Sequence, residues 1–287
     1  MLDQAASLRN LVKKVNDKDY DHKVKIITVT SGKGGVGKSN FVVNLSIHLQ
    51  KLGKKVLILD ADVGMGNDDV IMGIASKYNI YDAISGEVDL NKVMVKGPLG
   101  VMLLPAGSGI CDFSELGEEK IQIFIKKLTY YKEWDYIIMD TGAGINRTVL
   151  GFINCCDDLI VLTTPEPTSL KDAYGLIKAV SYFKLKTKAK LVVNRTIDSK
   201  EGIKTYKNMR AVSKRFLDID LDYLGSISED RKITQSIRKQ NPFTILYPKC
   251  KPSRDILDIA NKVLGFNKND NGLGVDGLFK KLFSIFS

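Results

Sequence analysis

The chain has 287 residues, of which 44% are hydrophobic and 26% charged, and its formal net charge at pH 7 is +10. This composition excludes a disordered or fibrous protein and is typical of a folded one. The length is enough to bury a sizeable core and fits one large α/β domain.

The sequence predicts a cytoplasmic protein. No run approaches the roughly 18 apolar residues of a membrane-spanning helix. The N-terminal segment MLDQAASLRN lacks the apolar core of a signal peptide. The four cysteines show neither CxxC spacing nor a nearby histidine pair, so we expect reduced and mostly buried thiols at Cys111, Cys155, Cys156 and Cys250.

The first predicted element is a polar N-terminal arm over residues 1–22. Leu8, Leu11, Val12 and Val15 recur within it at helical spacing, which indicates an amphipathic helix.

From residue 24 on, short apolar runs alternate with segments of helical pattern, which predicts a doubly wound, mostly parallel sheet. Several runs are apolar almost throughout, as strands covered on both faces must be. The helical segment 40–53 ends at Gly53, a residue suited to a helix C-cap. The predicted strands are 24–30, 55–62, 101–107, 135–141, 159–165, 190–194 and 222–228.

The segment from Gly32 to Ser39, GKGGVGKS, fits the phosphate-loop pattern GxxxxGK[ST] and lies between a predicted strand and a predicted helix. Its glycines let the backbone turn tightly so that N–H groups face the β-phosphate, and the helix adds the positive end of its dipole. We expect Lys38 to reach the β- and γ-phosphates and the Ser39 hydroxyl to hold Mg²⁺. The expected nucleotide-binding residues are Gly32, Gly34, Gly35, Val36, Gly37, Lys38, Ser39 and Asn40.

Two predicted strands end in carboxylates that would lie beside this loop. One carries Asp60 and Asp62, and a carboxylate at that edge of the sheet can orient an attacking water. The other, DYIIMDTGAG, ends in Asp140, which can bind Mg²⁺ through water, while Gly142 and Gly144 allow movement when the γ-phosphate departs. An aspartate at a strand end is also often only a turn or helix cap.

The positive charge is concentrated in residues 184–215, which hold eleven Lys or Arg against Asp198 and Glu201, a net charge of +9. Such a field favours anionic lipid, nucleic acid or an acidic protein as a partner. A solvated helix face explains the same pattern equally well.

The sequence ends with a Gly- and Asn-rich stretch, 265–277, which predicts a flexible linker, and with an amphipathic segment, 278–287. That segment is too short to span a bilayer as a helix, but it suits an interfacial anchor. A helix docked on the protein's own core is the alternative. The predicted membrane contacts are Leu278, Phe279, Lys280, Lys281, Leu282, Phe283 and Phe286.

The loop sequence, with its additional lysine at Lys33, resembles the deviant phosphate loop of the MinD/ParA family. The resemblance implies a MinD-like P-loop ATPase domain over 23–264 that binds ATP, ADP and Mg²⁺. In this family the early lysine crosses a dimer interface to the partner's phosphates, which implies an ATP-dependent sandwich dimer and a catalytic role for Lys33 beside Lys38. A cation supplied in trans would stabilise charge on the transferred phosphoryl group, as an arginine finger does. The alternative is a surface lysine in a loop.

The same resemblance implies roles for the strand-end carboxylates. The second aspartate of the DAD run orients water in this family, which implies that Asp62 is catalytic. Asp60 would then support the metal shell, together with Ser39 and Asp140.

Adenine contacts are also implied by the resemblance. The family places an asparagine against adenine at the end of the strand 190–194, and a second adenine loop follows the strand 222–228. The matching residues are Asn194, Ser228, Glu229 and Asp230. Asn194 could equally cap a turn, and Glu229 or Asp230 a helix. No NKxD guanine motif occurs at NRTID, so ATP is favoured over GTP.

Two further segments narrow the resemblance to the FlhG-type, MinD-like regulators of bacterial flagellar number. DQAASLRNLV resembles the DQAxxLRxLV element that precedes the ATPase domain in these regulators and stimulates the GTPase FlhF. DTGAGI and TTPEPTSLKDAYGLIK (163–178) are similar to the same group, and the tail resembles a MinD-type membrane-targeting helix. Unless the arm is a chance amphipathic helix, the residues that contact the GTPase would be Asp3, Gln4, Ala5, Leu8 and Arg9.

This resemblance implies an ATPase that dimerises with ATP and regulates flagellar number or placement. It would associate reversibly with anionic lipid at the inner face of the cell membrane. The implied protein partners are an FlhF-like GTPase and flagellar C-ring proteins of the FliM, FliN or FliY type.

Four other readings compete with this one. A ParA-type DNA-partitioning ATPase could use the basic segment on phosphates, but the tail and the arm argue against it and against nucleic acid. A MinD-type cell-division regulator shares the core and the tail but not the arm. A reductase like the nitrogenase iron protein needs cluster-holding cysteines, and none follows DTGAG closely. A nucleotide-gated scaffold whose slow hydrolysis times its assembly overlaps the preferred reading.

Overall fold

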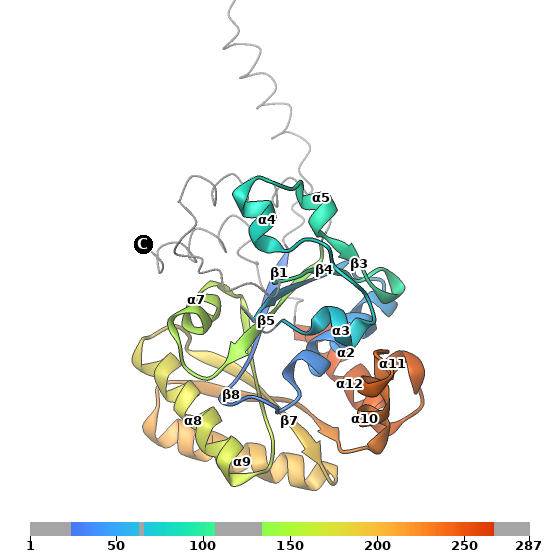
Figure 1. Ribbon diagram of the computed structural model, residues 1–287. Coiled ribbons are helices and arrows are strands. Elements are labelled where there is room, and N and C mark those ends of the chain that lie inside the picture. Colours follow the sequence, from blue (N-terminus) through green and yellow to red (C-terminus); the bar gives the residue numbers. More distant parts are fainter. Residues whose placement is uncertain (1–23, 63–65, 107–133, 267–287) are drawn as a thin grey trace, which may run out of the picture.

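The computed structural model describes residues 24–62, 66–106 and 134–266, and Figure 1 shows a sheet with helices on both sides. The predicted arm and terminal helix lie outside the described residues. The predicted contacts of the arm residues (Asp3, Gln4, Ala5, Leu8, Arg9) and of the tail residues (Leu278, Phe279, Lys280, Lys281, Leu282, Phe283, Phe286) therefore stay predictions.

Within the described residues, one eight-stranded sheet forms the centre of the fold, in the order β3-β4-β2-β5-β1-β6-β7-β8. Its neighbouring strands are parallel except β3, which is antiparallel to β4. Each predicted strand is present, so the predicted mostly parallel sheet is confirmed. The two-residue strand β3 was not predicted, because so short a segment carries no periodic pattern. The strands are β1 (Lys25–Ser31), β2 (Val56–Ala61), β3 (Val95–Lys96), β4 (Met102–Leu104), β5 (Tyr136–Ala143), β6 (Asp158–Thr163), β7 (Lys188–Thr196) and β8 (Asp220–Ser228).

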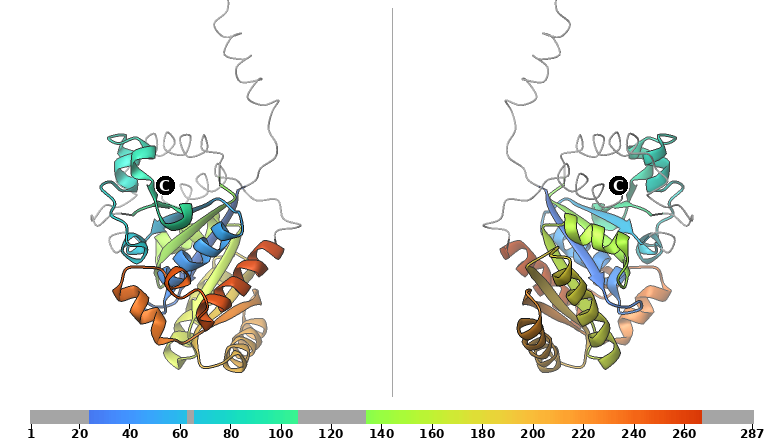
Figure 2. Two further views of the ribbon diagram at one scale, coloured as in Figure 1. Left: turned by 90° about the vertical axis from the view of Figure 1, so that its right-hand side faces the viewer. Right: turned by 90° about the vertical axis from the view of Figure 1, so that its left-hand side faces the viewer.

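Helices cover both faces of this sheet, as a doubly wound fold requires (Figure 2). Phe41 and Leu45 of α2 pack with Ile259 of α12 in the core of one face. Phe152 of α7 and Leu176 of α8 belong to the core of the other. The helices are α2 (Lys38–Lys51), α3 (Asp68–Met72), α4 (Ile80–Ser85), α5 (Leu90–Val93), the 3-10 turn η1 (Pro98–Gly100), α7 (Arg147–Cys155), α8 (Pro167–Tyr182), α9 (Ser199–Phe216), α10 (Arg231–Arg238), α11 (Phe243–Leu246) and α12 (Lys251–Phe266).

The C-terminus of α2 confirms the predicted role of Gly53. This glycine has a φ of 82°. Its N–H donates to the Gln50 carbonyl at 3.0 Å, and the Lys54 N–H donates to the Leu49 carbonyl at 3.0 Å. This pair of hydrogen bonds is a Schellman motif, in which glycine allows the left-handed turn that ends the helix.

The predicted start of the linker at residue 265 was wrong. Helix α12 continues to Phe266, so Gly265 and Phe266 belong to it. A glycine costs a helix only about 1 kcal/mol, and the buried Val263 keeps the last turn packed on the core.

β1 lies between β5 and β6 in the middle of the sheet and is buried at every residue. The crossover from β1 leads to β2 on one side, whereas the crossover from its neighbour β5 leads to β6 on the other. The carboxyl ends of β1 and β5 therefore form a topological switch point, where ligands bind in such sheets. The loop after β1 and the ends of β2 and β5 meet at this edge.

The remaining general predictions concern membrane spans and cysteines. In the part of the chain that the structure describes, no helix has the length and apolar character needed to cross a bilayer. Cys155, Cys156 and Cys250 are buried free thiols, as expected. Cys111 lies outside the described residues.

Candidate functional site

The loop between β1 and α2 depends on glycines for its shape. Gly35 and Gly37 have φ angles of 77° and 94°, in the region that only glycine adopts readily. A Cβ on Gly32 would lie 2.1 Å from the Asp172 carbonyl carbon of α8, and one on Gly37 would lie 2.4 Å from Asn194 Nδ2. The loop is therefore pressed against α8 on one side and β7 on the other.

Lys38, the first residue of α2, forms a buried ion pair with the end of β5. Its Nζ lies 2.5 Å from Asp140 Oδ1, and both side chains are almost completely inaccessible. Burial alone would lower the pKa of Lys38, but the carboxylates of Asp140, Asp68 and Asp62, with Asp140 the strongest, together outweigh it, and the net pKa is raised. Lys38 is thus held charged at the carboxyl edge of the sheet.

Asp60 and Asp62 lie beside this pair. Asp60 is opposite Asp140 in the β2–β5 register, and its Oδ1 accepts a hydrogen bond from the Asp62 N–H at 3.1 Å. Burial, and then repulsion by Asp140, raise the pKa of Asp60 to about 7. Asp62 is half-buried, and desolvation raises its pKa as well. The structure therefore brings together the predicted Lys38, Asp60, Asp62 and Asp140.

Asp68, which sequence reasoning missed, belongs to the same group. It is completely buried at the start of α3, and neither carboxyl oxygen has a hydrogen-bond partner. Burial, and then the charges of Asp140 and Asp60, raise the pKa of Asp68 well above its ordinary value. The run Asn67-Asp68-Asp69 looks like an ordinary helix start, so the sequence holds no sign of this burial.

A divalent cation would suit the charge of this group. Four aspartates share one buried lysine, and the Asp68 carboxylate is an orphaned buried acceptor. Among the described residues, no three histidine, cysteine or acidic side chains are gathered so as to hold a metal ion by themselves. The predicted Ser39 is half-exposed on the first turn of α2, next to Lys38.

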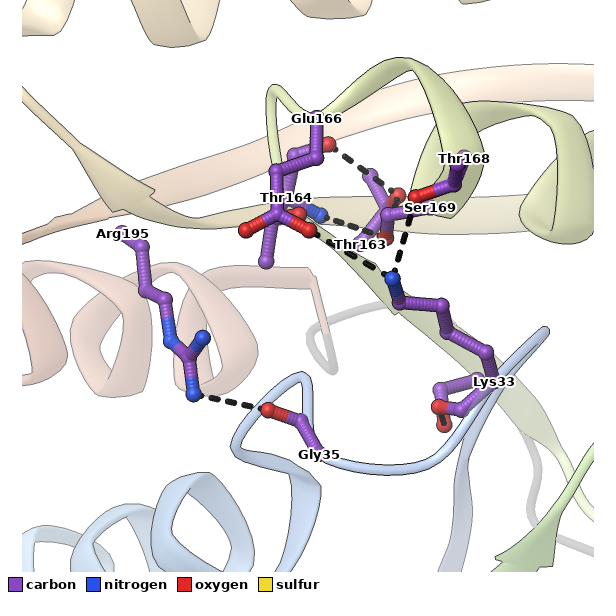
Figure 3. Close-up of polar contacts among 9 residues, drawn as sticks. Lys33, Gly35, Thr163, Thr164, Glu166, Thr168, Ser169 and Arg195 are labelled. Atoms are coloured by element: carbon purple, nitrogen blue, oxygen red, sulfur yellow. Dashed lines mark hydrogen bonds and ion pairs between the residues drawn. The ribbon is translucent and has the colours of Figure 1, made fainter.

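Lys33 contacts a different element of the fold from the one that Lys38 contacts. Its Nζ lies 3.1 Å from Thr168 Oγ1 and 3.4 Å from Glu166 Oε2, where α8 begins (Figure 3). The Lys33 and Glu166 side chains are 34% and 55% exposed. Surface ion pairs of this kind stabilise a fold by about 0–1 kcal/mol, so little energy holds Lys33 here.

A cavity of about 330 Å³ adjoins the loop on the side of β7. Gly37, Asn40 and Asn194 line it, together with Glu229 and Asp230 from the end of β8. Its other walls are Phe41, Arg195, Ile227, Ile233, Thr234, Ile237, Phe243 and Ile256.

Of the residues predicted to contact adenine, Ser228 is not in this lining. It is buried, and its N–H donates to Asp255 Oδ2 at 2.8 Å. Asp230 caps α10 by accepting from the Lys232 N–H, so the alternative role given to it also occurs.

Comparisons with known proteins agree with this geometry. The ParA family model, described as NUBPL iron-transfer P-loop NTPase, matches residues 23–264. The flagellum site-determining protein YlxH of Helicobacter pylori is 36% identical over 294 residues, covering 98% of this chain and 98% of that protein. The antiactivator FleN of Pseudomonas aeruginosa is 35% identical over 243 residues, covering 84% and 87%. The structure of the septum site-determining protein MinD of Pyrococcus horikoshii, complexed with Mg-ADP, superposes with a TM-score of 0.68 at 25% identity, covering 85% of this chain and 98% of that one.

Proposed function

Since this chain belongs to the MinD/ParA family of P-loop NTPases and is related to the flagellar regulators FleN and YlxH, we propose that it is a dimer-activated ATPase. Its ATP-bound form dimerises, associates with the membrane and sets the number or position of flagella. The observation that carries this proposal is that the loop's two lysines contact different elements: Lys38 pairs with the buried Asp140 of β5, and Lys33 contacts residues at the start of α8.

Lys38 is the cation for the chain's own nucleotide. It lies at the N-terminus of α2, where the loop N–H groups and the helix dipole favour phosphate. To reach the phosphates, its Nζ would exchange the Asp140 carboxylate, now 2.5 Å away, for phosphate oxygens. Asp140 begins the DTGAG segment, so this exchange couples nucleotide binding to that segment.

Mg²⁺ would be held by the Ser39 hydroxyl and the phosphates, with Asp60 and Asp140 binding through its water shell. When bound, it supplies positive charge that neutralises charge developing on the phosphoryl oxygens. Asp62, half-buried beside Gly142, orients the attacking water.

Lys33 is the cation given to the partner subunit. Its resting contacts with Glu166 and Thr168 are exposed and weak, so an approaching partner can replace them. Phosphate charge in a closed interface is a stronger attraction than a half-exposed carboxylate, because water no longer screens it.

The two segments outside the described residues would supply the specific contacts. The arm (1–22) stimulates an FlhF-like GTPase through Asp3, Gln4, Ala5, Leu8 and Arg9. C-ring proteins of the FliM, FliN or FliY type bind the dimer. The tail (278–287) binds anionic lipid weakly as a single copy. Two copies in a dimer raise the avidity by roughly 10² or more.

The central test is gel filtration of the full chain with ADP and with a non-hydrolysable ATP analogue. We expect a monomer with ADP and a dimer with the analogue. Lys38→Ala should lose nucleotide binding, measured by calorimetry, whereas Lys33→Ala should bind nucleotide but stay monomeric. Equal loss of binding in both variants, or a monomer in every state, would contradict the proposal.

Liposome flotation tests the membrane step separately. The unaltered chain should float with anionic vesicles in the analogue-bound state and not with ADP. Phe283→Glu should abolish flotation without preventing the dimer on gel filtration. Flotation that ignores the nucleotide would remove the gating from the proposal.

A further inference from the structure

Two consecutive residues at the end of β7 hold two consecutive carbonyls of the phosphate loop. Asn194 Nδ2 donates to the Val36 carbonyl at 2.7 Å. A terminal guanidinium nitrogen of Arg195 donates to the Gly35 carbonyl at 2.7 Å (Figure 3). Asn194 Oδ1 in turn accepts from the Arg195 backbone N–H at 2.9 Å, which fixes the amide orientation. We call this pair the loop clamp.

The planarity of the peptide bond gives these contacts a consequence for phosphate binding. In a trans peptide unit, the C=O and the N–H point in opposite directions. The Gly35 carbonyl shares its unit with the Val36 N–H, and the Val36 carbonyl shares its unit with the Gly37 N–H. When the clamp draws both carbonyls toward β7, both N–H groups face away from β7. N–H groups of this part of the loop cradle the phosphates.

The backbone of β7 is specially shaped to present this pair. Between Val193 and Thr196 the strand advances three residues while its partner β8 advances only from Ser226 to Ser228, so one extra residue is inserted. Arg195 has a φ of 56°, a left-handed conformation that costs a non-glycine residue about 1 kcal/mol. Bulges of this kind re-aim side chains next to functional sites.

The Arg195 side chain is exposed, and among the described residues its guanidinium contacts the phosphate loop rather than an acidic neighbour. Asn194 is buried, and its clamp contacts leave it one N–H and one lone pair, which a base could still use.

We infer that Arg195 is a positioning residue for nucleotide binding, which acts with Asn194 to turn the Val36 and Gly37 N–H groups toward the β-phosphate. This inference rests on the proposed nucleotide site and deepens it. Arg195 lies outside the phosphate-loop motif, and the inference assigns it a role in shaping that loop. Asn194 would position the loop in addition to contacting adenine.

The test compares ADP and AMP, because only ADP carries the β-phosphate. Each would be measured by competition with a fluorescent ADP analogue on the full chain, using Arg195→Ala and Arg195→Lys. Loss of one hydrogen bond from a charged donor should weaken ADP binding about ten-fold, with AMP changed by less than about two-fold. Lysine can donate to a single carbonyl, so Arg195→Lys should restore most of the ADP affinity. Thermal unfolding without nucleotide would verify that both variants are folded.

Three results would overturn the clamp. Equal weakening of ADP and AMP would make Arg195 a base or ribose contact. Unchanged ADP affinity in Arg195→Ala, or no recovery in Arg195→Lys, would show that the donated hydrogen bond does not position the loop. Absence of ADP binding by the unaltered chain would instead refute the proposed function itself.

Discussion

The crowding of carboxylates around Lys38 predicts an unusual pH dependence of folding stability. Burial and Asp140 raise the pKa of Asp60 from 3.8 to about 7. In nucleotide-free protein, the folded state therefore holds a proton at Asp60 that the unfolded state has released. Stability from this group is complete below about pH 4 and is lost as the pH rises through about 7.

The size of the effect follows from the two pKa values of Asp60. The difference between 3.8 and about 7 corresponds to about 4 kcal/mol in total, of which about 2–3 kcal/mol falls between pH 5 and pH 8. Asp60→Asn keeps the shape and cannot ionise, so it should remove this loss. Its neighbours Asp62 and Asp68, whose pKa values are also raised, contribute in the same direction.

Urea unfolding without nucleotide and divalent cations, at pH 5 and pH 8, measures the effect. The unaltered chain should lose about 1 M in urea midpoint at pH 8 relative to its own value at pH 5, more than Asp60→Asn loses. Asp135→Asn, immediately before β5 and outside the group, serves as the control. If the unaltered chain and Asp60→Asn lost the same stability between the two pH values, the carboxylate would not be held protonated as we argue.

Three further predictions concern the loop and its surroundings. Gly37→Ala should abolish ADP binding in calorimetry, because φ is 94° and the new Cβ would meet Asn194 at 2.4 Å, whereas Gly35→Ala, with open space around it, should cost only about 1 kcal/mol. Binding equal to that of the parent in Gly37→Ala would refute this close approach. Asp62→Ala should retain ATP and accumulate as a dimer on gel filtration, since the loss of water orientation leaves the phosphate contacts intact; hydrolysis at the parent rate would contradict its role. Glu166→Gln should release Lys33 and strengthen the analogue-dependent dimer by no more than about five-fold, because the ion pair is exposed; a weaker dimer would mean that Glu166 itself contacts the partner.

Most of the fold could be predicted from local sequence patterns. The central strands β1 and β2 are buried on both faces, so their apolar runs could be recognised without any knowledge of their partners. The phosphate loop was equally visible, because its glycines and Lys38 follow from backbone geometry and charge alone. Structural features that depend only on residues close together in the chain can be predicted from the sequence.

The missed features all depend on long-range pairing. Asp68 matters because tertiary packing buries it among Asp60 and Asp140, and nothing in its own segment requires this. The role of Arg195 depends on a bulge that arises only where β7 pairs with β8. Glu166 meets Lys33 across 133 positions of the chain, and a glutamate before Pro167 looks like an ordinary helix start.

Each cation or amide to which we assign a nucleotide contact already has a partner among the described residues. Lys38 is bound to Asp140, Lys33 to Glu166 and Thr168, and Asn194 to the loop. On nucleotide binding and dimerisation, these side chains would therefore exchange one hydrogen-bond or ion-pair partner for another. The free energy of each step is the difference between the old and the new contacts. The buried Lys38–Asp140 pair is the costly exchange, because separating it leaves a carboxylate uncompensated until a cation arrives. The exchange of the exposed Lys33 contacts costs little free energy by comparison.

We therefore expect Mg²⁺ to influence the first step, nucleotide binding, more than the second, dimerisation. This order can be measured, because the ratio of ADP affinities with Mg²⁺ and with a chelator should fall toward one in Asp140→Asn. A ratio unchanged by that substitution would separate Asp140 from the cation and refute the exchange.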